Sequence, residues 1–451
     1  MAGQAWDLPA ALGLESPGGL VAFAGGGGKT SLMFALAAAL PGRVVITTTT
    51  RIFAAQMRLA PAVLYSDDLT GLSRALDAHR RALVVGQVAG DKALGVDLAL
   101  PARLLARPDV DYVLVEADGS RMRPVKAPGD HEPAIPSETT LVVPVVGMDA
   151  LEAPIEEIAH RPERVRQILE AARGSGLAGQ EDDERLTPTT LARLLTHPLG
   201  GLKAVPAGAR VIPTLNKVEG NARLAAGREA ARLMLSEPRI ACVLLGAART
   251  AEPVREVWRR VTAVVLAAGE SRRMGRNKLL LPWGETTVLG QTLAHVRASG
   301  VSGLVVVTGY ERRRVEPIAD AHGAATVHND SYANGMLASV QTAVRQLAET
   351  VAAILVVLGD QPMVAPAVLD QLLAAYAGSR AGLVAPAYGS RRGNPVLIDR
   401  RHFAELLELP ADAAPRALLQ RHPDDLLLVP VDDEAILHDL DLPEEYQRWR
   451  P

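Results

Sequence analysis

The chain has 451 residues, a formal net charge of −3 at pH 7 and an apolar fraction of 48%. This length is too great for one compact core, and the near-neutral charge gives no support for a nucleic-acid or membrane-surface partner. The single cysteine, Cys242, excludes a disulfide framework and a cysteine metal cluster, and its apolar neighbours predict a buried structural thiol. No apolar run reaches membrane-spanning length and the first residues lack a signal-peptide pattern, so we expect a cytoplasmic protein.

The first half alternates apolar, strand-like runs with helical runs. A helix is expected over 29–40, before Pro41-Gly42, and polar helices over 152–199. This alternation predicts an α/β domain with a mostly parallel sheet. The predicted strands are 19–25, 43–50, 81–86, 111–120, 140–147, 209–215 and 239–247.

The segment 248–260 is polar, contains a proline and is interpreted as a linker or a terminal helix. The strand pattern then restarts, with a helix expected over 339–349. We therefore predict two domains, 1–258 and 259–451, the second also α/β and Rossmann-like. Its predicted strands are 262–268, 303–309, 324–329, 352–360, 382–388, 394–399 and 425–431.

Lysine is rare in this arginine-rich chain and occurs only at positions 29, 92, 126, 203, 217 and 278. Where arginine is the default cation, a retained lysine indicates a need for a compact point charge. Lys29, Lys217 and Lys278 fall inside the three nucleotide-like motifs of the chain. Lys126 is expected in a loop rich in proline and glycine, with Asp130 and His131.

The clearest phosphate-binding pattern is at 264–284, VVLAAGESRRMGRNKLLLPWG. Gly269 ends a strand and lets backbone amides approach a phosphate, while Arg273 and Lys278 supply charge. Asp360 ends the buried strand ILVVLGD at the usual ligand edge of an open sheet. A carboxylate beside a triphosphate is typical of a magnesium ligand.

Residues 266–278, LAAG-x-S-x-RMG-x-x-K, resemble the signature of MobA-like nucleotidyltransferases, and within these the molybdenum cofactor cytidylyltransferases. The resemblance spans about 261–451 and includes HDLDLPEEY, where it favours Asp441 over Asp439 as a second metal ligand, and 392–398 near the acceptor. It implies transfer of CMP from CTP to the phosphate of molybdopterin, with Mg²⁺ and pyrophosphate release. The implied catalytic residues are Arg273, Lys278, Asp360 and Asp441, with Asp360 and Asp441 as metal ligands, and the implied nucleotide-binding residues are Leu266, Ala267, Ala268, Gly269, Gly335 and Ser339.

A second phosphate motif, AGGGGKTS, fits a short G-x-x-G-K-T form over 25–30. Amides from Gly25 and Gly28 and a helix N-terminus would face phosphates, with Lys29 reaching them and Thr30 on Mg²⁺. Glu116 and Asp118 end a strand as Walker-B-like acids would.

Asn216-Lys217-Val218-Glu219 resembles the guanine-reading motif of GTPases with glutamate in place of aspartate. The nucleotide of this half is therefore ATP or GTP.

Residues 15–250 resemble the selenium-dependent hydroxylase accessory family through 25–30, 116–120, 128–133 and 215–218. Together the two resemblances imply a role in maturing molybdenum hydroxylases, with small-molecule substrates and a hydroxylase apoenzyme as a partner. Two alternatives remain open: a nucleotidyltransferase for a sugar or alcohol phosphate, and a nucleotide-switched chaperone that only holds cofactor.

Overall fold

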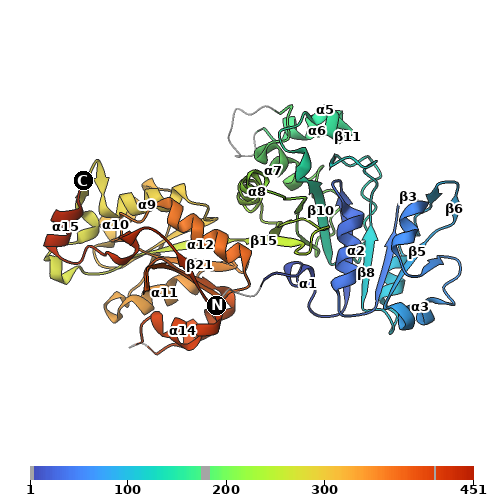
Figure 1. Ribbon diagram of the computed structural model, residues 1–451. Helices are drawn as coiled ribbons and strands as arrows, with labels where there is room; N and C mark the ends of the chain where they lie inside the picture. The colour runs from blue at the N-terminus through green and yellow to red at the C-terminus, as the bar shows by residue number, and fades with distance from the viewer. Residues whose placement is uncertain (1–4, 174–182, 411–412) are drawn as a thin grey trace. The chain divides into compact units, whose positions relative to one another are not determined.

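The computed structural model describes residues 5–173, 183–410 and 413–451 (Figure 1). Their contacts divide them into two compact units, one of Trp6–Trp258 and one containing Arg259–Pro451. Both units are α/β, as the sequence predicts, and their sheets are mostly parallel. Among the described residues, every helix is too short or too polar to traverse a bilayer.

The first unit is built on a twisted sheet with the strand order β15-β14-β13-β10-β1-β8-β2-β5-β4. Successive strand residues point to opposite faces, so Val21 joins a core with α1 and α2, whereas Leu20 joins a core with α3 and α4. The elements are α1 (Leu8–Ala11), β1 (Gly19–Gly25), α2 (Lys29–Ala39), β2 (Val44–Thr48), β3 (Ile52–Phe53), β4 (Val63–Tyr65), α3 (Leu72–His79), β5 (Arg81–Val85), β6 (Val88–Ala89), β7 (Lys92–Ala93), α4 (Leu100–Leu105), β8 (Tyr112–Glu116), β9 (Val125–Lys126), β10 (Leu141–Gly147), α5 (Ile155–Ile158), β11 (Ala159–His160), α6 (Pro162–Ala171), α7 (Pro188–Thr196), β12 (Arg210–Val211), β13 (Thr214–Asn216), α8 (Asn221–Met234), β14 (Cys242–Gly246) and β15 (Val254–Arg259).

The second unit has the strand order β20-β19-β16-β21-β24-β22-β23, and β25 pairs with β22. Strands β16, β19, β20 and β21 run parallel, whereas β24 is antiparallel to both of its neighbours. The elements are β16 (Val261–Ala267), β17 (Pro282–Trp283), β18 (Thr286–Thr287), α9 (Val288–Ala298), β19 (Gly303–Thr308), α10 (Arg312–Ala321), β20 (Ala325–His328), α11 (Met336–Val344), β21 (Ala353–Leu358), α12 (Pro366–Gly378), β22 (Leu383–Tyr388), β23 (Arg391–Arg392), β24 (Val396–Asp399), α13 (Phe403–Glu408), α14 (Arg416–Arg421), β25 (Leu426–Pro430) and α15 (Pro443–Trp449).

The sequence interpretation of 248–260 as a linker or helix is wrong. The segment contains β15, an edge strand beside β14. Its charge is misleading because Glu256 is buried, where it accepts hydrogen bonds from Arg228 Nε (3.1 Å) and the Trp258 indole (2.7 Å). The predicted helical stretch 152–199 contains α5, α6 and α7 but also β11, and its residues 174–182 lie outside the described part. Cys242 is buried as expected.

Candidate functional site

The second unit has a cavity of about 510 Å³ beyond the carboxyl ends of β16 and β21. In parallel α/β sheets this edge is where ligands bind, because strand ends and loops from both sides meet there. The loop after β16, the start of α11 and a segment before α15 close the cavity. Its lining comprises Leu266, Ala268, Gly269, Glu270, Ser271, Arg272, Arg273, Lys278, Leu279, Tyr332, Ala333, Gly335, Met336, Ser339, Leu358, Asp360, Asp439 and Asp441.

Lys278 joins the two predicted metal ligands within this cavity. Its ammonium nitrogen lies 2.6 Å from Asp441 Oδ1 and also forms an ion pair with Asp360 Oδ2. Arg273 Nη1 lies 2.8 Å from Asp441 Oδ2. Burial lowers the pKa of Lys278, but the charges and hydrogen bonds of Asp360 and Asp441 outweigh it and raise the pKa above its ordinary value. The lysine therefore carries its charge at neutral pH.

Backbone and side-chain contacts hold the C-terminal segment against the strand end that carries Asp360. The Leu440 amide donates to the Asp360 carbonyl oxygen (3.2 Å), and the Tyr446 hydroxyl donates to the Pro282 carbonyl (2.6 Å). An apolar cluster of Met274, Leu281, Trp283, Val288, Leu440 and Tyr446 packs the lysine loop onto the same segment. Residues separated by more than 160 positions thus share one pocket.

The pocket holds more acid than Lys278 alone neutralises. Asp439 lines it beside Asp360 and Asp441, and its pKa is raised, first by burial and then by repulsion from these two carboxylates. In Asp441 burial raises the pKa, but Lys278 and Arg273 outweigh it and the net shift is downward. Several carboxylate oxygens gathered around one cation form a donor set that suits Mg²⁺.

Most of the predicted nucleotide-binding positions meet in this cavity. Leu266, Ala268 and Gly269 line one part, and Gly335 and Ser339 line another. Ala267 and the acceptor-loop range 392–398 are not among the described lining residues.

The Ser339 hydroxyl is buried and accepts a hydrogen bond from Asn329 Nδ2 (3.0 Å). Sequence reasoning missed Asn329 and Tyr332, although Asn329 is the last residue of a predicted strand.

The first unit has a second cleft, of about 980 Å³, beside the N-terminus of α2. Gly27 has φ +67°, and a Cβ there would lie 1.9 Å from the Gly147 amide nitrogen, so the loop requires glycine at this position. Gly28, Lys29, Thr30, Asn216 and Lys217 line the cleft, whereas Gly25 does not. Gly25 instead donates its amide to Asp118 (3.0 Å).

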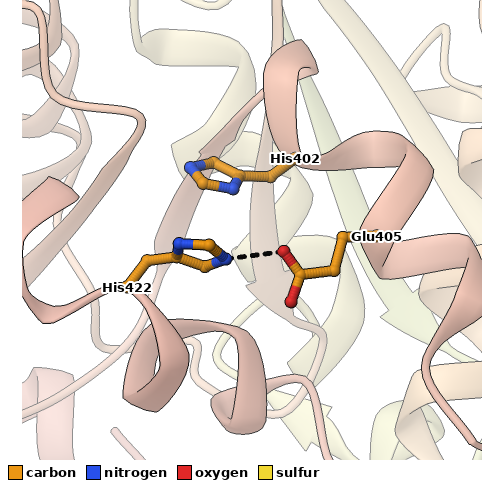
Figure 2. Close-up of side chains that lie close together, drawn as sticks. All are labelled: His402, Glu405 and His422. Carbon is orange, nitrogen blue, oxygen red and sulfur yellow. Dashed lines mark hydrogen bonds and ion pairs between the residues drawn. The ribbon is translucent and has the colours of Figure 1, made fainter.

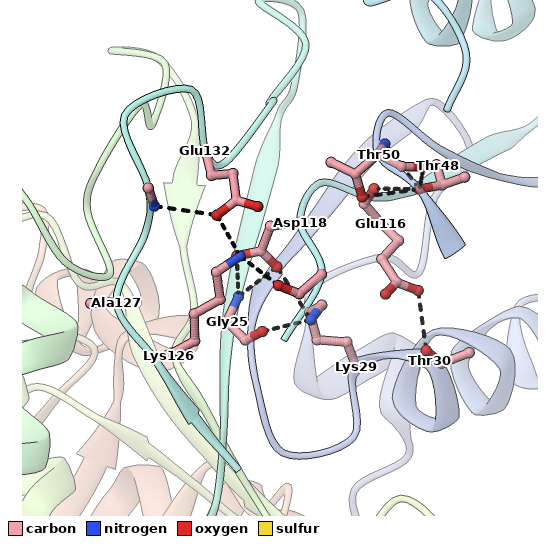
Figure 3. A network of polar contacts seen from close by, with 12 residues as sticks. Gly25, Lys29, Thr30, Thr48, Thr50, Glu116, Asp118, Lys126, Ala127 and Glu132 are labelled. Carbon is pink, nitrogen blue, oxygen red and sulfur yellow. Dashed lines mark hydrogen bonds and ion pairs between the residues drawn. The ribbon is translucent and has the colours of Figure 1, made fainter. Parts of the chain in front are cut away.

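Lys29 is buried and already has an anionic partner (Figure 3). Its ammonium nitrogen donates to the Gly25 carbonyl (2.5 Å) and lies 3.2 Å from Asp118 Oδ1. Thr30 donates its hydroxyl to Glu116 Oε2 (3.1 Å), and burial raises the pKa of Glu116. The lysine and hydroxyl of the predicted phosphate loop are thus placed against the two predicted Walker-B-like acids.

Lys126 extends this network from Asp118 to Glu132 (Figure 3). It lies in β9, paired with β11, and not in a loop as its composition suggested. Its side chain has 0% exposure, and its nitrogen lies 3.0 Å from Asp118 Oδ2 and 2.8 Å from Glu132 Oε2. Burial raises the pKa of Glu132, but hydrogen bonds and charge from Lys126 and Arg161 outweigh it and set the pKa to about 2.

Asn216 and Lys217 occupy one rim of the cleft. Asn216 Nδ2 donates to the Gly27 carbonyl (2.8 Å) and its Oδ1 accepts from the Ala248 amide (3.0 Å), so it fixes the glycine loop. Lys217 forms an ion pair with Asp149 (2.6 Å). Glu219 also lines the cleft, whereas His131 is exposed and outside the described lining.

Comparison with known proteins agrees with this division of the chain. The MobA-like NTP transferase domain model matches residues 263–426, and the fold and cavity of the second unit define a nucleotidyltransferase domain of that type. The YqeC protein model matches residues 21–163. The uncharacterized protein YqeC of Escherichia coli (strain K12) is 34% identical over 216 residues, covering 46% of this chain and 78% of that protein. The chain therefore belongs to the YqeC family, with a MobA-like nucleotidyltransferase domain in its C-terminal part.

Two further similarities concern the C-terminal part. The molybdenum cofactor cytidylyltransferase of Escherichia coli (strain K12) is 27% identical over 187 residues, covering 41% of this chain and 93% of that protein. The structure of Rv0371c from Mycobacterium tuberculosis H37Rv in complex with manganese is 32% identical, covers 42% of this chain and 97% of its own, and has a TM-score of 0.36.

Proposed function

We propose that the C-terminal domain is a Mg²⁺-dependent CTP:molybdopterin cytidylyltransferase. The observation that carries this proposal is the meeting of Lys278, Asp360 and Asp441 in a cavity that is also lined by three of the four LAAG residues. A domain of MobA-like type and a cytidylyltransferase relative that the chain covers almost completely support the choice of reaction.

The proposed chemistry is an in-line displacement at phosphorus. A phosphate oxygen of the acceptor attacks the α-phosphorus of CTP, the bond to the bridging oxygen breaks, and pyrophosphate leaves with the electron pair. Arg273, Lys278 and the amides near Gly269 neutralise the charge that moves onto the leaving group. Rate enhancement then comes from positioning and electrostatics, without a side-chain nucleophile.

The residues fit a magnesium ion. Asp360 and Asp441 each place an oxygen on the same ammonium group, so one cation already bridges them. Bound there, Mg²⁺ would supply charge neutralisation between two phosphate groups that otherwise repel each other. Asp439 adds negative charge to the same pocket.

We assign the base specificity to the strand end. The Ala268 methyl group lines the cavity and narrows the space next to the base, which favours a pyrimidine over a purine. Titration of the full chain with CTP and GTP in the presence of Mg²⁺ tests this assignment. CTP should bind more tightly, and a preference for GTP contradicts it.

The reaction is tested by measuring pyrophosphate release from CTP with molybdenum cofactor as acceptor. Asp360→Asn should abolish most activity, while Asp320→Asn, a matched change at an exposed position on α10, should leave it unchanged. Full activity of Asp360→Asn contradicts the proposed site. Activity with a sugar phosphate or an alcohol phosphate but not with the pterin contradicts the proposed acceptor.

For the N-terminal domain we propose binding of ATP or GTP with Mg²⁺ at the glycine loop, in an accessory step of molybdenum hydroxylase maturation. The buried Lys29, with Thr30 and Glu116 beside it, supports this proposal. Titration of the full chain with each labelled nucleotide tests it, with excess CTP present to fill the other site. Lys29→Ala should remove binding and Lys203→Ala, outside the described lining of the cleft, should not; equal binding by Lys29→Ala contradicts the proposal.

A further inference from the structure

A third group of ligating side chains lies in the second unit, apart from the residues that line its cavity (Figure 2). His402 lies in the turn between β24 and α13, Glu405 is in α13, and His422 follows α14. Each residue offers one ligand atom, and these three atoms lie within 4.8 Å of one another. Figure 2 shows the three side chains directed toward one another.

The contacts within the group are close. His422 Nε2 lies 2.6 Å from Glu405 Oε2, and the two imidazole rings have centroids 4.7 Å apart. The His402 side chain is only 7% exposed, whereas those of Glu405 and His422 are about one third exposed. The group thus has one fixed, buried member and two members that solvent can reach.

Asp425 fixes the orientation of His402. Asp425 Oδ2 lies 2.8 Å from His402 Nε2, and its other oxygen accepts the Gly382 amide proton (2.8 Å). This carboxylate favours the tautomer with the proton on Nε2, in which Nδ1 has the free lone pair. Metal-binding histidines commonly have such a carboxylate on the second nitrogen, because it sets the tautomer and raises ligand basicity.

Charge around the group does not oppose a cation. Arg421 Nη1 donates a hydrogen bond to Glu405 Oε1 (3.1 Å), and the other carboxylate oxygen, Oε2, faces His422. Arg401 lies 3.7 Å from Asp425 Oδ1. The two arginines are therefore balanced by Glu405 and Asp425, and an incoming ion meets a neutral environment.

We propose that His402, Glu405 and His422 form a binding site for a divalent transition-metal ion, Zn²⁺, with a fourth position open to water. Two imidazoles and one carboxylate are ligands that Zn²⁺ accepts in three-ligand sites. Zinc–ligand distances of about 2.0–2.2 Å place tetrahedral ligands about 3.4 Å apart. Rotations of the two partly exposed side chains close the gap from the present separations. The ion ties α13 to the segment after α14.

The test measures Zn²⁺ bound by the full chain after removal of metals, in excess Mg²⁺ to occupy the aspartates of the cavity. Equilibrium dialysis should give one Zn²⁺ per chain, and Co²⁺ should show the visible absorption of a tetrahedral site. His422→Ala and Glu405→Gln should remove both signals. Asp425→Asn should weaken binding about 10- to 100-fold, since it removes an outer carboxylate.

The matched control is His328→Ala, which removes a histidine paired with Asp330 (3.2 Å) elsewhere in the unit. It should retain Zn²⁺ binding and the Co²⁺ spectrum. A full chain that binds no Zn²⁺ under these conditions, or equal binding by His422→Ala and Glu405→Gln, overturns the proposal and leaves the group as an ordinary histidine–glutamate pair. Loss of folding is monitored by circular dichroism, and the conservative variant His422→Gln then replaces His422→Ala.

Discussion

Removal of the buried ammonium of Lys126 should destabilise the first unit strongly. This side chain has 0% exposure, forms ion pairs with Asp118 and Glu132, and donates a hydrogen bond to the Gly119 carbonyl (2.7 Å). Lys126→Met keeps much of the volume but leaves two carboxylates without their shared cation. Removing one partner of a buried ion pair costs about 3–5 kcal/mol, because the remaining charge stays desolvated.

The lower end of this range applies here. Lys29 stays within 3.2 Å of Asp118, and Arg161 stays within 2.7 Å of Glu132, so neither acid becomes wholly unpaired. A loss of about 3 kcal/mol corresponds to a fall in melting temperature of about 6–12 °C for a unit of this size. Scanning calorimetry of the full chain measures the fall. Lys203→Met serves as control because that ammonium contacts the carbonyl oxygens of Gly129 and Asp130 and forms no ion pair in the described residues.

The described network is refuted if Lys126→Met melts within about 2 °C of the wild type, because such a shift corresponds to a loss of less than about 1 kcal/mol in the free energy of unfolding. The double variant Lys126→Met/Glu132→Gln provides a second check. In this background Glu132 has lost Lys126 and keeps Arg161, so Glu132→Gln should cost less stability here than it does in the wild type. If Glu132→Gln costs the same in both backgrounds, the coupling between these residues is not the electrostatic one described.

Three further predictions follow from other contacts. Folding lowers the pKa of Glu132 from 4.5 to about 2, so its contribution of about 3 kcal/mol to stability is present above pH 4.5 and is lost as the pH falls toward 2. Urea unfolding at several pH values should therefore show the difference in stability between the wild type and Glu132→Gln shrinking over this range. A difference that stays constant contradicts the prediction. Gly27→Ala should weaken nucleotide binding and lower stability by more than Gly90→Ala, which shares a positive φ but has open space at its Cβ; equal effects in binding and urea titrations contradict the steric argument. Arg273→Ala should lower kcat about 100-fold through lost transition-state charge neutralisation yet leave the melting temperature unchanged, since its side chain is 72% exposed; unchanged kcat in the pyrophosphate assay contradicts its role.

The sequence predicted the strands well because buried parallel strands are continuous apolar runs. Such runs coincide with the strands β1, β8, β10, β16 and β21. Each of the three nucleotide-like motifs lies at the end of a strand. The longest strand that the interpretation missed is β15, and the short strands β9 and β11 were also missed. The charged residues of β15 are typical of a surface segment, and the sequence does not reveal that Glu256 is buried. The hydrogen-bond partners of Glu256 are Arg228, which is distant in the sequence, and Trp258, on the same strand.

Within the sites, sequence reasoning identified groups but not their partners. The rarity of lysine singled out Lys126, yet nothing local indicated that it is buried between Asp118 and Glu132. Such pairing depends on β9 lying beside β11, a contact between short segments without a strong apolar pattern. Likewise, Asp441 was assigned through a resemblance, because the packing that brings it to Lys278 involves residues far apart in the chain.

Both candidate sites share one electrostatic arrangement. In each, a lysine suited to phosphate is paired with carboxylates: Lys29 with Asp118, and Lys278 with Asp360 and Asp441. In the second unit, a phosphate alone would draw Lys278 away from Asp360 and leave that carboxylate without its ion-pair partner, and a metal alone would leave the lysine facing a second cation. A nucleotide bound with its metal meets both needs, because the acid exchanges lysine for metal and the lysine exchanges acid for phosphate. We therefore expect nucleotide and metal to bind the cavity of the second unit as a pair, since either one alone breaks an ion pair that it cannot replace.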